Sequence, residues 1–341
     1  MRRFVAVGVI LLLLASTSIA GLWQGYLQFL QSPLNIETGG LVINVEPGAS
    51  IRSVVAELER RSVTQAHWHW RLLVRLQPLV IKAGEYLLVP GMSAPDLLQL
   101  LASGKVVSYR FTIVEGWSLQ QLLAELGKDP VLQHSVQGTA DLAKQAGFHE
   151  GNLEGWFLPE TYMFERGGSD LNILQRAYTA MQQALAETWV GRDDKLPYET
   201  QKDLLIMASI IEKETGLDAE RAAIAGVFVR RLNKHWRLET DPTVIYGMGV
   251  SYAGNISRRD LKHDTPYNTY TRHGLPPTPI ALPGEASLQA AARPAAGEAM
   301  FFVADGQGGH TFSVTLQAHN EAVRKLLKSS KKPKKQQDSG K

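Results

Sequence analysis

The chain has no cysteine among its 341 residues. Disulfide bonds and thiolate metal sites are therefore excluded, although the redox compartment stays open because an oxidising space does not require disulfides. Positive and negative residues also nearly balance. The net charge is +3, too small to indicate a nucleic-acid partner. No metal or nucleotide motif is present, so we expect no cofactor.

The N-terminus carries an uncharged apolar run, "FVAVGVILLLLASTSIAGLW", residues 4–23. At about 1.5 Å per residue, such a helix spans roughly 30 Å of hydrocarbon. The two arginines before it predict that residues 1–3 stay in the cytoplasm and that the rest of the chain lies outside. Trp23 and Tyr26 suit the far membrane interface. The alternative is a signal peptide cleaved after "SIA", before Gly21.

A spacer, residues 24–40, leads into a repeated pattern. "VEPGASIRSVVAEL", "LVPGMSAPDLLQLL" and "IVEGWSLQQLLAEL" share one register, with glycine, then serine two residues later, then apolar residues at +1, +4, +5 and +8 from the serine. This spacing predicts one apolar helix face, with serine as the N-cap. Strand-like runs, "LVINV" and "SYRFTIV", precede two copies. Residues 41–127 are therefore predicted to form strand–turn–helix units, either as structural punctuation or as a module that holds an extended polymer.

The remainder, residues 128–327, predicts a mixed α+β domain. It contains an aromatic-rich block, "GNLEGWFLPETYMF", three predicted helices and a long loop rich in glycine, proline and tyrosine. Such structured loops often carry function. "AMFFVADGQGGHTFS" predicts a hairpin. The lysine-rich end, residues 328–341, is expected to be a disordered tail.

An apolar helical run, "DLLIMASII", ends in Glu212. Loss of water favours the protonated form of a carboxyl group, and a protonated acid can give its proton to a leaving oxygen. The alternative is that Glu212 pairs with an arginine such as Arg221 or Arg230. Glu214 lies about 200° further around the helix and is expected on the solvent side.

Glycoside hydrolysis usually needs two carboxylates. The candidates for a second carboxylate are Glu154, Glu160 and Asp241. One acid suffices if the sugar's own hydroxyl attacks the anomeric carbon, because the same residue can then give and take the proton. The side chains suited to stacking on or hydrogen-bonding a sugar polymer are Tyr246, Tyr252, Tyr267, Tyr270 and Asn268.

Several blocks together resemble a known family. "LEGWFLPETY", "ASIIEKET", "RLETDPTVIYGMG", "YNTYTRHGLPPTPIALPG" and "FFVADGQGGHTFSVTLQAHN" are similar to the signature blocks of the YceG-like endolytic murein transglycosylases, the MltG family. The resemblance covers residues 41–327 and keeps the family's order. That order is a membrane anchor, a small LysM-like α/β subdomain, here residues 41–127, and a mixed α+β catalytic domain, here residues 128–327.

The resemblance implies cleavage of the β-1,4 bond between N-acetylmuramic acid and N-acetylglucosamine within peptidoglycan strands, with a 1,6-anhydromuramyl end. It implies a single-pass inner-membrane protein that faces the periplasm and terminates growing strands, with peptidoglycan as substrate and peptidoglycan synthases as possible partners. Two alternatives stay open: a non-catalytic wall-binding anchor, and a hydrolase of the same bond.

The resemblance also assigns residues. Glu212 stands at the family's catalytic position. The substrate contacts expected from the resemblance are Glu154, Glu160, Asp241, Tyr267, Asn268, Tyr270 and His310. Trp156 and Glu160 replace the family's usual phenylalanine and aspartate, so the charge at Glu160 is kept but its reach differs. His310 fits either a hydrogen-bonding role near the cleft or a role in positioning the hairpin.

Overall fold

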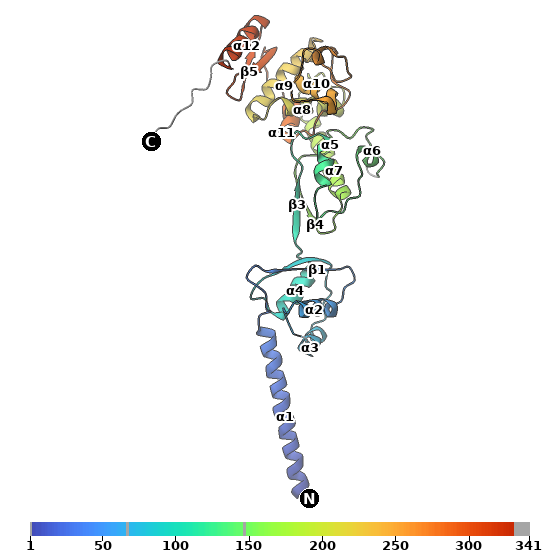
Figure 1. The fold of residues 1–341 in the computed structure, drawn as a ribbon, viewed down its shortest axis with the longest axis vertical. Coiled ribbons are helices and arrows are strands. Elements are labelled where there is room, and N and C mark those ends of the chain that lie inside the picture. The colour runs from blue at the N-terminus through green and yellow to red at the C-terminus, as the bar shows by residue number, and fades with distance from the viewer. Residues whose placement is uncertain (1, 66–67, 146–147, 331–341) are drawn as a thin grey trace, which may run out of the picture. The chain divides into compact units, whose positions relative to one another are not determined.

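The computed structural model describes residues 2–65, 68–145 and 148–330. It confirms a mixed α+β chain with small sheets (Figure 1). The chain forms two compact units: residues 1–109 with 163–167, and residues 110–162 with 168–341. In the predicted tail, residues 331–341 lie outside the described residues, whereas residues 328–330 belong to a helix.

Helix α1 (Arg2–Gln31) confirms the predicted N-terminal apolar helix. Within the described ranges it is the one helix long and apolar enough to cross a membrane, over Ala6–Gln31. It runs past the predicted span 4–23, so the predicted spacer 24–40 begins as helix. The reason is packing, because the end of α1 contributes to the core of the first unit.

Tyr26 has a packing role that the sequence did not predict. It was expected at the far membrane interface, which stays a prediction, and within the protein it is only 3% exposed. Its ring stacks on Trp68 and His69, with centroid distances of 6.3 and 6.2 Å. An aromatic side chain covered in this way belongs to the core of the unit.

The first unit is built on a two-stranded antiparallel sheet. Strand β1 (Leu41–Val45) pairs with β2 (Gly84–Leu88). Helices α2 (Ile51–Arg60), α3 (Trp68–Leu76) and α4 (Ala94–Ser103) supply the rest of the core. Fully buried members of this core are Leu58, Leu73, Tyr86, Leu88, Ala94, Leu97 and Leu101.

The glycine–serine repeat forms three helix starts, as predicted. Ser50, Ser93 and Ser118 each cap a helix, and each takes part in a reciprocal capping box. The glycines before them have φ of 79°, 85° and 73°, the left-handed region that favours glycine. The third helix, α5 (Leu119–Leu126), lies in the second unit.

The second unit is mainly helical. Its elements are α6 (Thr139–Leu142), α7 (Asp170–Val190), α8 (Gln201–Glu214), α9 (Asp218–Asn233), α10 (Asp241–Met248), the short helices Gly249–Ser251 and Asp260–Lys262, α11 (Glu285–Ala292), and α12 (Leu316–Ser330). Strand β3 (Ser108–Thr112) neighbours β4 (Thr161–Glu165), and the residues of each strand are divided between the two units. The predicted hairpin is confirmed as β5 (Phe301–Ala304) and β6 (His310–Ser313), with Ala304 opposite His310.

Helix α8 is the centre of this unit. Helices α7, α9, α10 and α11 pack against it, and every residue from Leu204 to Ile211 is buried. The helix begins at a capping box between Thr200 and Asp203. Burial on all sides explains the continuous apolar run in the sequence, and it brings the last turn of α8, which carries Glu212, close to the start of α11.

Candidate active site

Glu212 lies in the last turn of α8, and its side chain is 6% exposed. Its Oε2 atom accepts a hydrogen bond of 2.7 Å from Ser287 Oγ and one of 3.1 Å from the Gly284 backbone N–H. Both donors stand at the start of α11. The carboxyl group is thus fixed between two helices by one of its oxygens.

The other oxygen faces an arginine. Arg221 Nη2 is 3.7 Å from Glu212 Oε1 and 3.9 Å from Glu115 Oε2, and the Arg221 side chain is 6% exposed. Arg221 also pairs with Asp218. The ion pair left open by the sequence therefore involves Arg221, whereas Arg230 donates to backbone carbonyl groups.

Glu115 is a member of this cluster that the sequence did not identify. Burial raises the pKa of Glu115, the nearby Glu212 carboxylate raises it further, and Arg221 lowers it. A Cβ at Gly284 would collide with the Glu115 carboxylate, so glycine permits this close approach. One signal was available: the first two repeats have proline before the glycine, and the third has Glu115.

A cavity of about 880 Å³ lies in the same unit. Its lining includes Gly116, Ser118, Leu119, Glu154, Lys213, Pro242, Ile245 and Tyr246. Lys213 Nζ donates to the Gly116 carbonyl over 3.0 Å. A Cβ placed on Gly116 would be 3.9 Å from Glu212 Cγ. Glu212 therefore neighbours Gly116 of the cavity lining, but it is not itself one of the lining residues.

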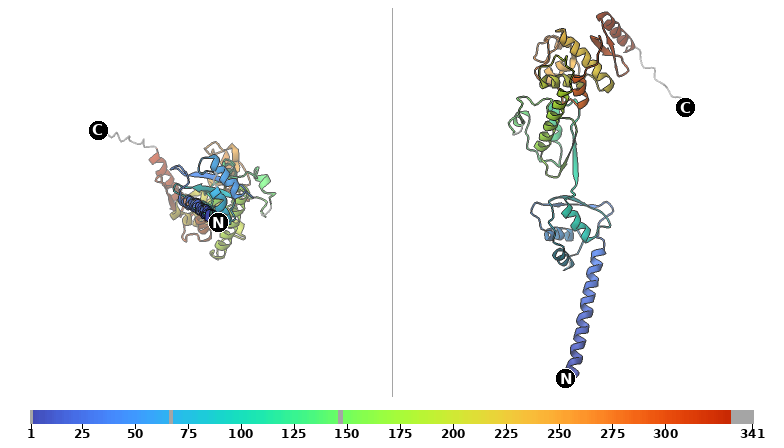
Figure 2. Two further views of the ribbon diagram at one scale, coloured as in Figure 1. Left: turned by 90° about the horizontal axis from the view of Figure 1, so that it is seen from below. Right: turned by 180° about the vertical axis from the view of Figure 1, so that it is seen from behind.

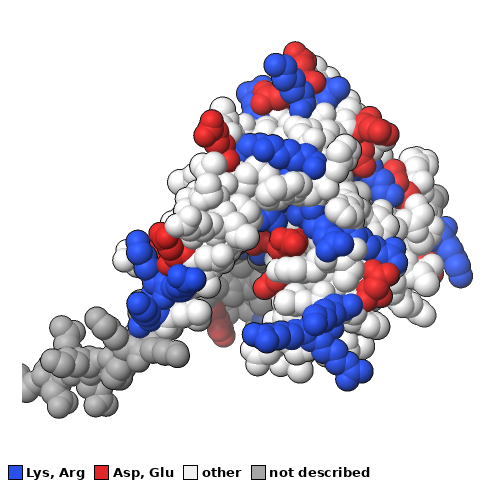
Figure 3. All heavy atoms as spheres, turned by 90° about the horizontal axis from the view of Figure 1, so that it is seen from above, with Lys and Arg blue, Asp and Glu red and all other residues white. Residues whose placement is uncertain are grey.

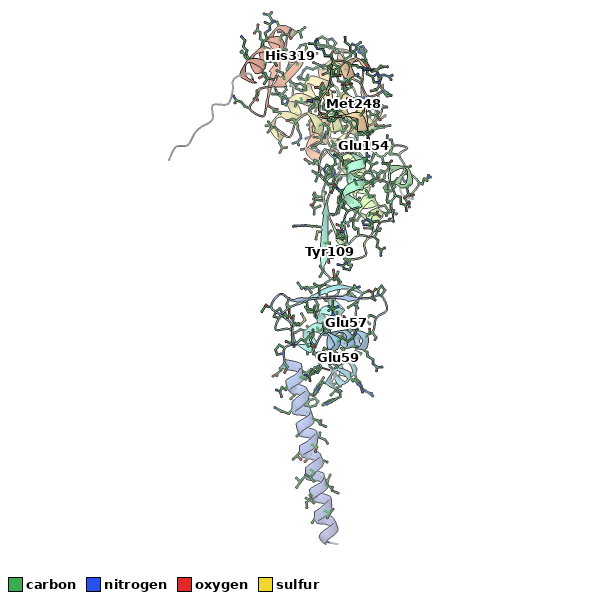
Figure 4. The ribbon with its side chains drawn as sticks, viewed as in Figure 1. Glu57, Glu59, Tyr109, Glu154, Met248 and His319 are labelled. Atoms are coloured by element: carbon green, nitrogen blue, oxygen red, sulfur yellow. The ribbon has the colours of Figure 1, made fainter. Side chains whose placement is uncertain are left out.

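Glu154 is the acid in the wall itself. It is 5% exposed; its Oε1 accepts from the Leu119 N–H over 2.9 Å, and its Oε2 accepts from the Tyr246 hydroxyl over 3.1 Å. Burial raises the pKa of Glu154 to about 7, although both hydrogen bonds act in the opposite direction. Figure 4 labels this residue in the second unit. A cavity acid that carries its proton for part of the time near neutrality is suited to acid–base chemistry.

The loop residues predicted as contacts lie beside the cavity lining and not in it. The Tyr270 hydroxyl donates to Asp241 Oδ1 over 2.6 Å. Tyr267 packs edge-on against the cavity residue Tyr246, with centroids 4.8 Å apart. Glu160 is exposed, and its carboxylate accepts the N–H of the next residue.

Two predicted contacts have other roles. Asn268 is 0% exposed, and its amide donates to the carbonyl groups of three residues of its own loop, the shortest bond being 2.7 Å to His263. It fixes the loop. The His310 ring atom Nδ1 is 2.7 Å from Glu220 Oε2, and the His310 backbone N–H donates to Glu220 Oε1. His310 therefore ties the β5–β6 hairpin to α9.

Glu214 also corrects a prediction. It was expected on the solvent side, but burial raises its pKa to about 7, and the Thr240 hydroxyl donates to it. The loop that leads into α10 covers this side of α8. Periodicity within one helix could not show that cover, because the loop comes from 26 residues further along the chain.

Comparison with known proteins places the chain in a family. A family model described as "YceG-like family" matches residues 43–325. The chain is 31% identical over 307 residues to an endolytic murein transglycosylase of Bacillus subtilis, covering 84% of this chain and 85% of that protein. It is 25% identical to one from Streptococcus pneumoniae, of which it spans 61%. The chain belongs to the YceG-like family.

A solved structure shares the fold. The crystal structure of a yceG-like protein from Listeria monocytogenes aligns with a TM-score of 0.52 and 29% identity, over 84% of this chain and 99% of that one.

On the face drawn in Figure 3, Lys and Arg side chains are interspersed with Asp and Glu side chains. Within the described residues, no group of three or more potential metal-ligating side chains is found.

Proposed function

We propose that this protein is a membrane-anchored lytic transglycosylase that cleaves within peptidoglycan strands. Membership of the YceG-like family and relatives named endolytic murein transglycosylases support the activity. Residues 128–327 are the catalytic domain in this proposal, together with residues 110–127, which belong to the same unit and contribute to the cavity. The part of the predicted LysM-like region 41–127 that lies in the first unit is then residues 41–109. The span within α1 leaves residues 1–3 in the cytoplasm and the catalytic domain in the periplasm.

In the proposed reaction, Glu212 donates one proton and later takes one proton back. Glu212 gives its proton to the oxygen that bridges N-acetylmuramic acid and N-acetylglucosamine, and the glycosidic bond breaks. The C6 hydroxyl of the muramyl sugar attacks its own C1, and its proton passes to the Glu212 carboxylate. The product is a 1,6-anhydro ring, no water is consumed, and the enzyme regains its starting state.

The position of Glu212 is the observation that carries the proposal. Oε2 is held by Ser287 and Gly284, whereas Oε1 accepts no hydrogen bond from the described residues and has only the Arg221 guanidinium at 3.7 Å. Oε1 is thus the oxygen available to carry the proton. Because Glu212 neighbours Gly116 of the cavity lining but does not line the cavity, the proposal requires a local shift that brings Oε1 and the bound sugar together.

We assign the cavity to the sugar strand. Glu154 and Tyr246 supply buried hydrogen-bonding groups there, and Asp241, Tyr267 and Tyr270 border it. A strand bound across this cavity would be cut internally, which fits termination of growing strands beside peptidoglycan synthases.

The test compares Glu212→Gln with Glu199→Gln, an exposed acid of the same unit. Both variants should keep the wild-type circular dichroism and melting temperature. Glu212→Gln should release no anhydro-ended fragments from purified peptidoglycan, whereas Glu199→Gln should match the wild type. Release by Glu212→Gln at an undiminished rate rejects the assignment.

A hydrolase of the same bond is the second candidate, and Glu154 favours it, because a second acid near the cavity can activate water. Mass spectrometry separates the two products, since a hydrolysis product is heavier by one water. Reducing ends in place of anhydro ends would establish the hydrolase. Sedimentation with peptidoglycan and no new sugar ends would establish a non-catalytic anchor.

A further inference from the structure

One surface of the first unit has a chemistry that the proposed activity does not use. Helix α3 buries Trp70 and Leu73 in the core. Its outward side carries exposed side chains at helical spacing, namely Trp68, Arg71, Arg75 and Leu76. The segment that follows exposes Leu79 and Val80, the latter by 85%. A helix with arginines and a tryptophan on its outer side is typical of a membrane–water interface.

The surface is continuous with the membrane-spanning helix. The His69 ring of α3 stacks on Phe29 of α1 with centroids 5.1 Å apart, and Trp68 stacks on Tyr26. In Figure 1, α3 lies at the end of the first unit from which α1 emerges, and β1 lies at the opposite end. The right view of Figure 2 shows the same arrangement from behind.

The depth of this contact matches the headgroup layer. If the hydrocarbon span ends near Trp23, then Tyr26 and Phe29 lie about 4.5 and 9 Å beyond it at 1.5 Å per residue. The headgroup region adds roughly 5–8 Å on each side of the hydrocarbon. Tyr26 therefore lies within the headgroup layer and Phe29 just past its outer edge, so the helix stacked on them is held beside the lipid headgroups.

Charge selects the partner. Residues 68–82 contain no Asp or Glu, but they contain Arg71, Arg75 and Lys82. Arg61 is excluded, because it pairs with Glu57 and donates to the Val42 carbonyl. Residues 1–36 contain no Asp or Glu either. A basic segment without acids of its own, held at this depth, attracts anionic headgroups.

We propose that the outer side of α3 and residues 77–82 form a docking surface for anionic phospholipid in the bilayer that α1 spans. The arginines contact headgroup phosphates, and Trp68, Leu76 and Val80 enter the boundary between headgroups and acyl chains. Docking holds the first unit against the membrane. This inference rests on the proposed membrane anchor.

The absence of cysteine provides a direct test. Single cysteines replace Leu76, Val80, Val42 or Leu12 in the full chain, each receives a nitroxide label, and the protein is placed in nanodiscs containing phosphatidylglycerol. Val42 is the matched control, because it is 43% exposed and stands on β1 at the opposite end of the unit. Leu12, within α1, reports on the anchor itself.

Labels at Leu76 and Val80 should collide more with oxygen than with a water-soluble nickel chelate, whereas the label at Val42 should show the reverse. Replacing phosphatidylglycerol by phosphatidylcholine should reduce the docked population. Introducing Arg71→Gln together with Arg75→Gln should also reduce it, by roughly fivefold for each arginine removed. Leu12 should stay in the hydrocarbon throughout.

The docking surface would be overturned, and the anchor left intact, by one combined result. In that result the labels at Leu76 and Val80 are as accessible to nickel as the label at Val42, while the label at Leu12 is in hydrocarbon. A label at Leu12 in water would overturn both. Protection of Leu76 and Val80 by isolated peptidoglycan in the absence of lipid would assign the surface to the wall polymer and overturn the proposal.

Discussion

At the scale of single residues, the candidate site depends on which groups surround Glu212. The apolar helix that ends in Glu212 is visible in the sequence, but its partners are remote. Ser287 is 75 positions away, and Gly284 is 72. Such distances carry no periodic signal. Burial on a crowded helix could be predicted, whereas the identity of the donors could not.

Ser287→Ala should lower the turnover number by roughly ten- to hundredfold, because a hydrogen bond to a charged group contributes about 1.5–3 kcal/mol and the carboxyl group would lose its orientation. The Michaelis constant should change little, since the Ser287 side chain is fully buried behind the site. Steady-state release of muropeptide fragments measures both quantities. Ser251→Ala, at an exposed site, is the control. Unchanged turnover in Ser287→Ala would contradict the positioning role.

Glu154 should make stability depend on pH. Because its pKa rises from 4.5 unfolded to about 7 folded, the folded protein binds this proton more tightly. The stabilisation is complete below about pH 4.5 and is lost as the pH rises through 7. The full difference corresponds to about 3 kcal/mol.

Chemical denaturation between pH 4.5 and 8 measures this effect. Glu154→Gln, which mimics the protonated acid, should show a smaller loss of unfolding free energy with rising pH. Glu214 has a pKa raised to about 7 by burial as well, so the slope that remains should fall further in the double variant with Glu214→Gln. Parallel curves for wild type and Glu154→Gln would show that the acid is not desolvated.

At the scale of elements, the glycine–serine repeat was the most reliable pattern. It predicted α2, α4 and α5 together with their caps, because capping chemistry is local and needs only neighbouring residues. The β5–β6 hairpin was also predictable, because two strand-like runs flank a glycine-rich turn in the local sequence. The extension of α1 beyond residue 23 was not predicted, since it depends on contacts with α3.

Ser50→Ala and Ser118→Ala should each cost about 1 kcal/mol of stability, because both remove an N-cap. Their effects on activity should differ. Ser118 lines the cavity and caps the helix whose first N–H binds Glu154, whereas Ser50 lies in the other unit. Differential scanning calorimetry and fragment release per folded molecule distinguish the two effects. Equal loss of activity in both variants would mean that α5 has no special part in the site.

At the scale of the whole molecule, α1 has two roles in the structure. Its apolar stretch has the length of a membrane span, and its last turns complete the core of the first unit. A truncation that removes the span can therefore also remove part of a folded domain.

A chain that begins at Gln24 should keep the first unit intact, whereas one that begins at Ser32 should destabilise it by about 3 kcal/mol, as expected for loss of a buried aromatic residue. Tyr26→Ala in the full chain should reproduce most of this loss. Hydrogen exchange of the β1–β2 amides reports on the first unit alone. Equal protection in the two truncated chains would show that the end of α1 contributes nothing to the core.

The sequence by itself determined the features that depend on neighbouring residues: the apolar span, the three capped helices, the hairpin, and the placement of Glu212 at the end of a buried helix. Tertiary structure alone decided the Arg221 and Glu115 contacts, the burial of Glu214, the inward position of Asn268 and the burial of Tyr26. Each of these depends on how loops and helices meet in space, whether the partners are tens of residues apart, as for Glu214 and Thr240, or only a few, as for Asn268 and His263. Desolvation and ion pairing act through space, so no local pattern records them.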